Sequence, residues 1–282
     1  MILPVSRRSF LVLSISAYTA APGKQTSLKV GCQANAWALQ PGDFEQLIRT
    51  IQTMKDLGYA GFECNIRFIS GQFGRATEAR KRIEATGMKF IGAHMSMQQA
   101  REQFSGLSGR VAQLGAEFIV MSGAGLSPTG TFSADALKAK AGELETLAKT
   151  CRQNGISLAY HNHTAEFSNG NAEIDALADH TDPLLVHFLI DAGHGYQSGG
   201  DPAAFLLRNS QRIVGCHLKT FRERTHQVAL GQGDFGFETL AAAIEKTDWT
   251  GWLIDEEGGG PAGGNQSAVG PDREYIKKVF GV

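Results

Sequence analysis

Short apolar runs alternate with longer amphipathic segments along most of the chain, starting near residue 28. In residues 43–57, for example, Leu47, Ile51 and Met54 recur at helical spacing, and Gly58 follows as a stop signal. The short apolar runs predict eight strands. These predicted strands are residues 28–35, 59–65, 88–96, 116–123, 156–163, 184–194, 212–221 and 251–257.

The alternation of strands with helices predicts parallel strand pairing. Eight strand–helix units in about 255 residues, with no linker-like stretch between them, match a single closed (β/α)8 barrel of the α/β class. An open doubly wound sheet is the alternative, and we disfavour it because no Gly-x-Gly-x-x-Gly motif follows the first strand. The predicted helices are residues 43–57, 75–86, 98–114, 133–154, 201–209, 236–246 and 272–280.

The start of the chain has a different pattern. Arg7 and Arg8 precede an apolar run, residues 10–21, that is too short to span a bilayer and ends in small residues, as a signal peptide does. Residues 6–11, Ser-Arg-Arg-Ser-Phe-Leu, resemble the twin-arginine export signal. We expect residues 1–23 to be this signal and residues 24–282 to be the barrel, periplasmic or secreted, with no stable membrane anchor after cleavage. A chance Arg pair before a disordered tail is the alternative.

The net charge and the cysteine spacing argue against several classes of partner and site. The 282 residues carry a formal net charge of -1 and show no dense Lys/Arg run, so we expect no nucleic-acid partner. No Cys-x-x-Cys pair occurs, so we expect buried thiols rather than a zinc ribbon or a thioredoxin-like site. Export would permit a disulfide, but the spacing identifies no pair. Composition does not give the oligomeric state.

Ionisable residues gather at one end of the predicted strands. In a (β/α)8 barrel, the carboxyl-terminal strand ends form the active site. Carboxylates and imidazoles together suit Mn, Mg, Co or Zn as a divalent cation, which would polarise a carbonyl or a vicinal diol. Lys219 and the remaining histidines would bind substrate oxygens. The residues at these ends are Glu63, His94, His161, His163, Asp191, His194, His217, Lys219, Glu256 and Glu257.

Several motifs, in this order, resemble the xylose-isomerase-like TIM-barrel superfamily, and within it the sugar phosphate isomerase/epimerase family. They are AYHNHTAEF, LIDAGHGYQSGGDP, GCHLKTF, LGQGDFGFETL and GWLIDEE, and the resemblance covers roughly residues 28–280. It implies a metal held by residues that follow strands five to eight. Asp191, His217 and Glu256 match three of these ligands. Glu63, His94, His163, His194 and Lys219 are expected to contact substrate.

The fifth-strand ligand departs from the family pattern. Many members have Glu where this chain has His161, so either His161 binds the metal directly or Glu166 reaches back into the site. Glu166 and Glu256 are also the expected catalytic carboxylates, because they follow strands on opposite sides of the barrel. One would remove a proton next to a carbonyl and the other would return it.

The resemblance and the site residues favour a metal-dependent isomerase or epimerase of a sugar or keto-sugar. A second hypothesis keeps the barrel but gives a lyase, hydrolase or dehydratase that acts on a 3-keto-glycoside or keto-polyol. Export favours an unphosphorylated substrate, since sugar phosphates are scarce outside the cytoplasm. An endonuclease for abasic DNA would need a basic groove, and the near-neutral net charge argues against this alternative. A non-catalytic sugar-binding barrel would not need four metal-type ligands.

Overall fold

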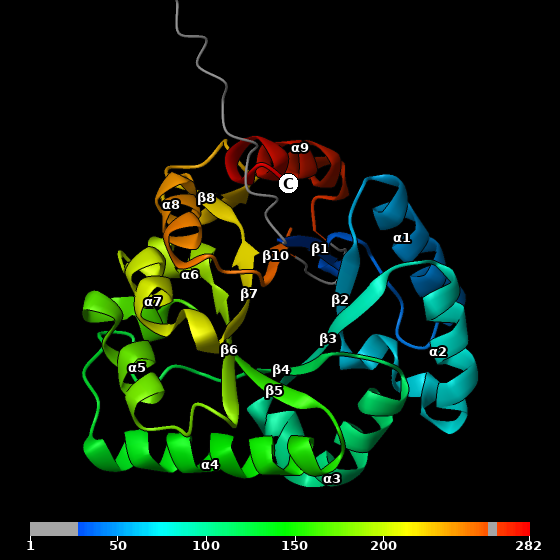
Figure 1. Ribbon diagram of the computed structural model, residues 1–282, viewed down its shortest axis with the longest axis horizontal. Coiled ribbons are helices and arrows are strands. Elements are labelled where there is room, and N and C mark those ends of the chain that lie inside the picture. The colour runs from blue at the N-terminus through cyan, green and yellow to red at the C-terminus, as the bar shows by residue number, and fades with distance from the viewer. Residues whose placement is uncertain (1–27, 259–263) are drawn as a thin grey trace, which may run out of the picture.

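Eight parallel strands close into a barrel in this computed structural model, which describes residues 28–258 and 264–282 (Figure 1). The strand order around the barrel is β1-β10-β7-β6-β5-β4-β3-β2. The prediction of a single (β/α)8 barrel is therefore confirmed, and the open-sheet alternative is wrong. The barrel strands are β1 Lys29–Gln33, β2 Gly61–Asn65, β3 Lys89–Ser96, β4 Phe118–Ser122, β5 Ser157–His161, β6 Val186–Asp191, β7 Ile213–Leu218 and β10 Trp252–Asp255.

Helices surround the barrel on its outer side (Figure 1). Seven of the helical segments match the sequence prediction to within a few residues. The helices are α1 Phe44–Asp56, α2 Ala76–Ala85, α3 Met97–Gln113, α4 Ala134–Gln153, α5 Ser168–Asp179, α6 Ala192–Gln197, α7 Pro202–Asn209, α8 Glu238–Thr247 and α9 Val269–Phe280. None of the helices in the described part of the chain has the length and apolar character needed to cross a membrane. The expected signal at residues 1–23 lies outside the described residues.

The sequence prediction missed two helices and a two-stranded hairpin. The first turn of α5 contains Asn169, Gly170 and Asn171 with φ between 52° and 69°, so the polar, left-handed start hides the helix from a periodicity search. The six residues of α6 are too few to show a period. A short antiparallel hairpin, β8 Thr220–Arg222 and β9 His226–Val228, follows β7 and lies outside the barrel sheet.

The barrel interior is filled by side chains at its amino-terminal end. Ile91, Val120, Leu189 and Trp252 are buried together there, apart from the larger apolar layer between strands and helices. Gly61 makes room for the indole of Trp252, because a Cβ at this position would lie 2.7 Å from the ring. A packed lower barrel leaves the carboxyl-terminal ends as the place where polar side chains can face inward.

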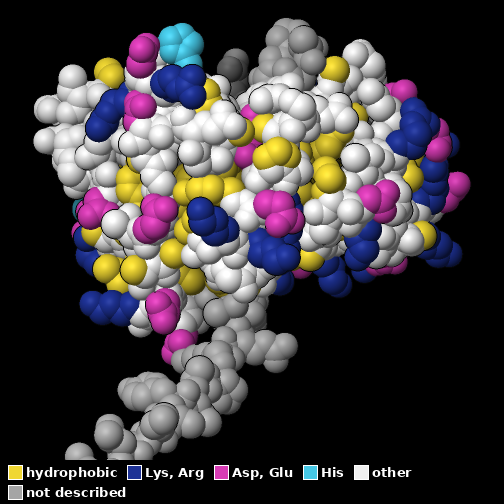
Figure 2. Space-filling model, turned by 90° about the horizontal axis from the view of Figure 1, so that it is seen from above, with side chains coloured by type: hydrophobic (Ala, Val, Ile, Leu, Met, Phe, Trp, Pro, Cys, Tyr) yellow, Lys and Arg dark blue, Asp and Glu magenta, His cyan; other side chains and the backbone are white. Residues whose placement is uncertain are grey.

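The surface is mixed in charge. In the face shown in Figure 2, Lys and Arg side chains are interspersed with Asp and Glu. The four cysteines are all buried and free.

Candidate metal centre

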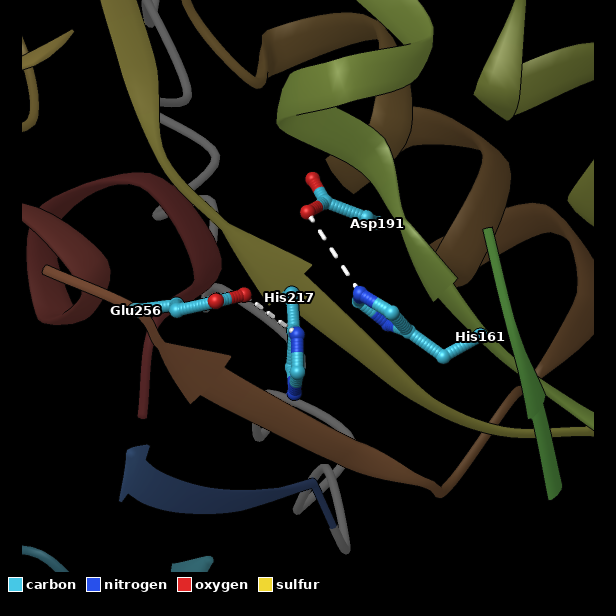
Figure 3. A group of neighbouring side chains, drawn as sticks. All are labelled: His161, Asp191, His217 and Glu256. Atoms are coloured by element: carbon cyan, nitrogen blue, oxygen red, sulfur yellow. Dashed lines mark ion pairs between the residues drawn. The ribbon is translucent and has the colours of Figure 1, made fainter. Parts of the chain in front are cut away.

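Four side chains converge at the carboxyl-terminal end of the barrel (Figure 3). One nitrogen or oxygen from each of His161, Asp191, His217 and Glu256 lies within 4.8 Å of those of the other three, and all four residues are buried. Figure 3 shows His161 facing Asp191 and His217 facing Glu256. The sequence search singled out all four residues, and the structure brings them together.

The strand alternation explains this convergence. β5, β6, β7 and β10 are neighbours in the barrel, and the ladder pairs Asp191 directly with His217. Successive side chains of a strand point to opposite faces, so Ile254 and Glu256 face inward together while Asp255 faces the helices. The last inward position of each of the four strands thus carries a metal-type side chain.

Asp191 also begins a helix. Its Oδ1 accepts a hydrogen bond of 2.8 Å from the backbone N–H of His194 and caps α6. Asn162, which sequence reasoning passed over, holds the Asp191 backbone from both sides. Its Oδ1 accepts from Asp191 N at 2.8 Å and its Nδ2 donates to Asp191 O at 3.1 Å. Asp191 Oδ2 is left to face the centre.

The atoms that face one another lack ordinary partners. Asp191 Oδ2, His217 Nδ1 and Glu256 Oε2 are buried, and beyond ion pairs none of them makes a hydrogen bond of good geometry. Buried polar atoms are almost always satisfied, so a set that has only ion pairs is a candidate position for a cation. Two carboxylate oxygens and two imidazole nitrogens suit a divalent cation such as Mn²⁺, Co²⁺ or Zn²⁺. The donor set therefore fits the expected metal.

His217 lies between two carboxylates. Its Nε2 is 3.2 Å from Glu63 Oε2, and its Nδ1 is 2.5 Å from Glu256 Oε2. Burial alone would lower the pKa of His217, but Glu63 and Glu256 outweigh it and raise the pKa to about 10. A carboxylate beside one ring nitrogen, as Glu63 lies beside Nε2, orients a histidine that binds a metal through the other nitrogen.

Glu63, which was expected to contact substrate, contacts two side chains of the protein instead. One of its oxygens faces His217, and the other accepts a 3.0 Å hydrogen bond from Gln33 Nε2. Gln33, at the end of β1, was not among the predicted site residues. No sequence signal distinguishes it, because its partner lies 30 residues away.

Lys219 compensates the buried negative charge. Its Nζ lies 2.8 Å from Asp191 Oδ2 and 3.1 Å from Glu256 Oε2. Burial opposes the ionised form of Glu256, but Lys219 and His217 hold the pKa of this carboxyl well below its usual range. Burial, with His217 and His94 nearby, lowers the pKa of His161 well below its usual value. Neutral His161 can therefore offer a lone pair to a metal.

Glu166, the other predicted fifth-strand ligand and a predicted catalytic carboxylate, does not belong to this group. Its Oε1 accepts a 2.6 Å hydrogen bond from Tyr160 Oη, and its Oε2 accepts from His163 N at 3.1 Å. Lys140 Nζ lies 3.7 Å from Glu166 Oε1. A short 3-10 turn, Ala165–Phe167, folds Glu166 toward the helical layer. Of the two alternatives for the fifth strand, the structure brings His161 into the centre.

Three further predicted histidines surround His161. The buried ring of His94 lies 4.8 Å from it and that of His163 lies 5.3 Å from it, as measured between ring centroids. His194 Nε2 lies 3.7 Å from Asp191 Oδ2, and its Nδ1 is 2.8 Å from Gln197 Oε1. His94 and His163 border the centre from β3 and from the residues after β5, and His194 borders it from α6.

Glu257 lies apart from Glu256, on the outer side of the barrel. Its carboxyl group forms a second cluster with Asp255 and Asp272, all three buried. Burial, together with Asp272, raises the pKa of Glu257 to about 8. Burial raises the pKa values of Asp255 and Asp272 as well.

Comparison with known proteins agrees with the observed fold. The model of the xylose isomerase-like TIM barrel family matches residues 51–279. An inosose dehydratase of Bacillus cereus (strain AH820) is 26% identical over 304 residues, covering 92% of this chain and 99% of that protein.

Solved structures share the fold at lower identity. An L-ribulose 3-epimerase has a TM-score of 0.76 and 15% identity, over 90% of this chain and 95% of that one. The 3-keto-D-glucoside 4-epimerase of E. coli has a TM-score of 0.66 and 16% identity, over 90% and 100%. The IolI protein, whose structure holds a zinc atom, has a TM-score of 0.72 and 12% identity, over 90% and 98%.

Proposed function

The chain belongs to the xylose isomerase-like TIM barrel family, and from this membership we propose that it is a metal-dependent isomerase or epimerase of a keto-sugar. The observation that carries the proposal is the convergence of His161, Asp191, His217 and Glu256, with Lys219 between the two carboxylates. This set joins a cation site to acid–base groups, which is what proton transfer next to a carbonyl requires.

The four side chains would hold a divalent cation. Bound there, the cation would polarise a substrate carbonyl and make the neighbouring C–H more acidic. Glu256 lies at the centre, beside the position where the cation would bind, and its carboxylate is the group proposed to take up this proton. Lys219, an ammonium beside Glu256 Oε2, holds a substrate oxygen and limits the repulsion between the carboxylate and the developing negative charge.

Inversion at a carbon needs a second acid–base group on the other face of the substrate. The position of Glu166 removes it from this role, and we assign the role to His163. His163 follows β5, across the barrel from Glu256, and its side chain is exposed next to His161. Its Nδ1 lies 3.3 Å from Gly123 O, which favours a proton on Nδ1 and leaves the lone pair of Nε2 for the substrate.

Dehydration of a keto-polyol is the second candidate. It is favoured by the nearly full-length similarity to an inosose dehydratase, and it would begin with the same removal of a proton by Glu256. The hydroxyl on the next carbon would then leave as water after accepting a proton, and a carbon–carbon double bond would form. A single carboxylate and a general acid suffice for this elimination.

The test uses the metal-loaded protein with a panel of keto-sugars and keto-polyols in D₂O, followed by NMR. An isomerase or epimerase places solvent deuterium on the carbon next to the carbonyl, whereas a dehydratase gives an unsaturated ketone. The Glu256→Gln variant should lose about 10²-fold or more in turnover, the scale of general acid–base help. Glu238→Gln is the control, because Glu238 is exposed on α8. Full activity of Glu256→Gln would contradict the proposal.

A further inference from the structure

A cavity of ≈ 780 Å³ lies beside the metal centre, between α3 and α4. We propose that it is a subsite for a neutral second ring, so that the natural substrate is a glycoside rather than a free monosaccharide or a sugar phosphate. This inference rests on the proposed function, since it names the substrate class of the same site. The volume of the cavity falls within the range of about 300–1,000 Å³ that is common for small-molecule pockets.

The cavity opens at the same end of the barrel as the metal centre. Its floor includes Ser96 and Ser122, the last residues of β3 and β4, and its walls come from α3 and α4, which are neighbours in Figure 1. His163 also lines it. Since the His163 ring lies 5.3 Å from that of His161, one imidazole borders both spaces. A substrate whose reacting carbon sits at the centre would extend past His163 into the cavity.

The cations that line the cavity already have partners. Lys140 Nζ lies 2.5 Å from Glu173 Oε1 and donates to Ala124 O at 3.1 Å. Arg101 binds Glu143 through two hydrogen bonds of 2.8 and 3.1 Å, which link α3 to α4. Both cations are thus already compensated by carboxylates, and the described lining offers a phosphate no uncompensated positive charge. The lining therefore disfavours an anionic group.

The remaining lining is both polar and apolar. Hydroxyl and amide groups come from Ser96, Ser122 and Gln98, and apolar surface comes from Met97 and Leu126. A pyranose ring has hydroxyls at its edge and C–H groups on its faces, so it can use both kinds of surface. This lining matches a neutral sugar ring in size and chemistry.

Binding measurements test the subsite without any turnover. Cellobiose, glucose and glucose 6-phosphate are titrated by NMR into the metal-free wild type and into two variants. Ala139→Trp fills the cavity from α4, whereas Lys138→Trp places the same side chain on the adjacent exposed position outside the lining. Cellobiose should bind the wild type at least about tenfold more tightly than the other two ligands. Ala139→Trp should weaken cellobiose binding at least about tenfold, and Lys138→Trp should not.

Three results would overturn the subsite: no cellobiose binding, unchanged binding by Ala139→Trp, or preference for glucose 6-phosphate. The proposed function fails separately, if the metal-loaded wild type turns over no keto-sugar. When turnover occurs, kcat/KM should be higher for a keto-glycoside than for the free keto-sugar. Equal kcat/KM values would refute the subsite and leave the proposed function standing.

Discussion

At the residue scale, Asp191 connects the fold to the site, because one oxygen caps α6 and the other faces the metal centre. The Asp191→Asn substitution separates the two roles. Asn can still accept the hydrogen bond from His194 N, but it lacks the charge that a divalent cation requires. We expect metal affinity to fall at least about 100-fold while the helix content stays the same.

Glu166→Gln is the matched variant for this prediction, since Glu166 is equally buried but lies outside the centre. It should keep its metal and lose stability instead. Elemental analysis after dialysis, together with Mn²⁺ titration calorimetry, measures metal binding, and thermal unfolding measures stability. Full metal occupancy in Asp191→Asn, or metal loss in Glu166→Gln, would show that the ligands are misassigned.

His187 gives a pH prediction that is separate from the site. Burial, and to a lesser extent Arg212, lowers the pKa of His187 in the folded protein. Below pH about 6.5 the unfolded chain therefore binds a proton that the folded chain does not, and the free energy of unfolding falls as the pH falls. We expect His187→Leu to lose less stability than the wild type between about pH 7 and pH 5. Urea unfolding at both pH values measures this difference, and the exposed His226→Gln should behave as the wild type does.

The sequence identified most of the site at this scale for a physical reason. Asp191, His217 and Glu256 lie at or beside the ends of barrel strands, and the position of a strand end follows from the apolar pattern before it. Whether His161 or Glu166 faces the centre depends on the direction of a three-residue turn, which no periodicity encodes. The role of Glu63 depends on contacts with Gln33 and His217, and the second of these is 154 residues away along the chain.

At the element scale, close contact between α6 and β7 depends on Gly193. A Cβ there would lie 2.3 Å from Lys219 O and 2.4 Å from Lys219 Cγ. We expect Gly193→Ala to destabilise the protein by about 1–3 kcal/mol, as overpacking does, and to displace Lys219 from the two carboxylates. Thermal unfolding and metal titration are the measurements.

Gly142 is the matched control for Gly193. It lies in the interior of α4, is exposed, and would place a Cβ in open space. Gly142→Ala should therefore raise stability by about 0.5–1 kcal/mol, because Ala favours the helix. If both substitutions have the same effect, the close contact at Gly193 does not limit the packing.

Strands and long helices were predictable because their apolar periods are local. The start of α5 was not, since Asn169, Gly170 and Asn171 adopt left-handed conformations that indicate a turn. The β8–β9 hairpin has three residues in each strand, too few for alternation to be recognised.

At the scale of the whole molecule, we propose that the barrel is exported through the twin-arginine pathway. The observation that supports this proposal is the Ser-Arg-Arg-Ser-Phe-Leu sequence at residues 6–11. Replacing both Arg7 and Arg8 by Lys should retain the protein in the cytoplasm, as fractionation and immunoblotting would reveal. Arg49→Lys and Arg67→Lys together form the control. Undiminished export of the variant that carries both Arg7→Lys and Arg8→Lys would refute the pathway.

The four candidate ligands lie at or just after the ends of four consecutive strands of the barrel, β5, β6, β7 and β10, whereas most of the cavity lining comes from the β3–α3 and β4–α4 units, with His163 shared between the two spaces. The residues that would hold the cation and most of the residues that line the cavity therefore belong to different strand–helix units. On the proposed subsite, substitutions at Met97, Leu126 and Ala139 would change the lining of the cavity without replacing any of the four candidate metal ligands. We therefore expect that exchanging the β3–α3 and β4–α4 units between relatives changes the sugar that is bound and leaves metal binding unchanged.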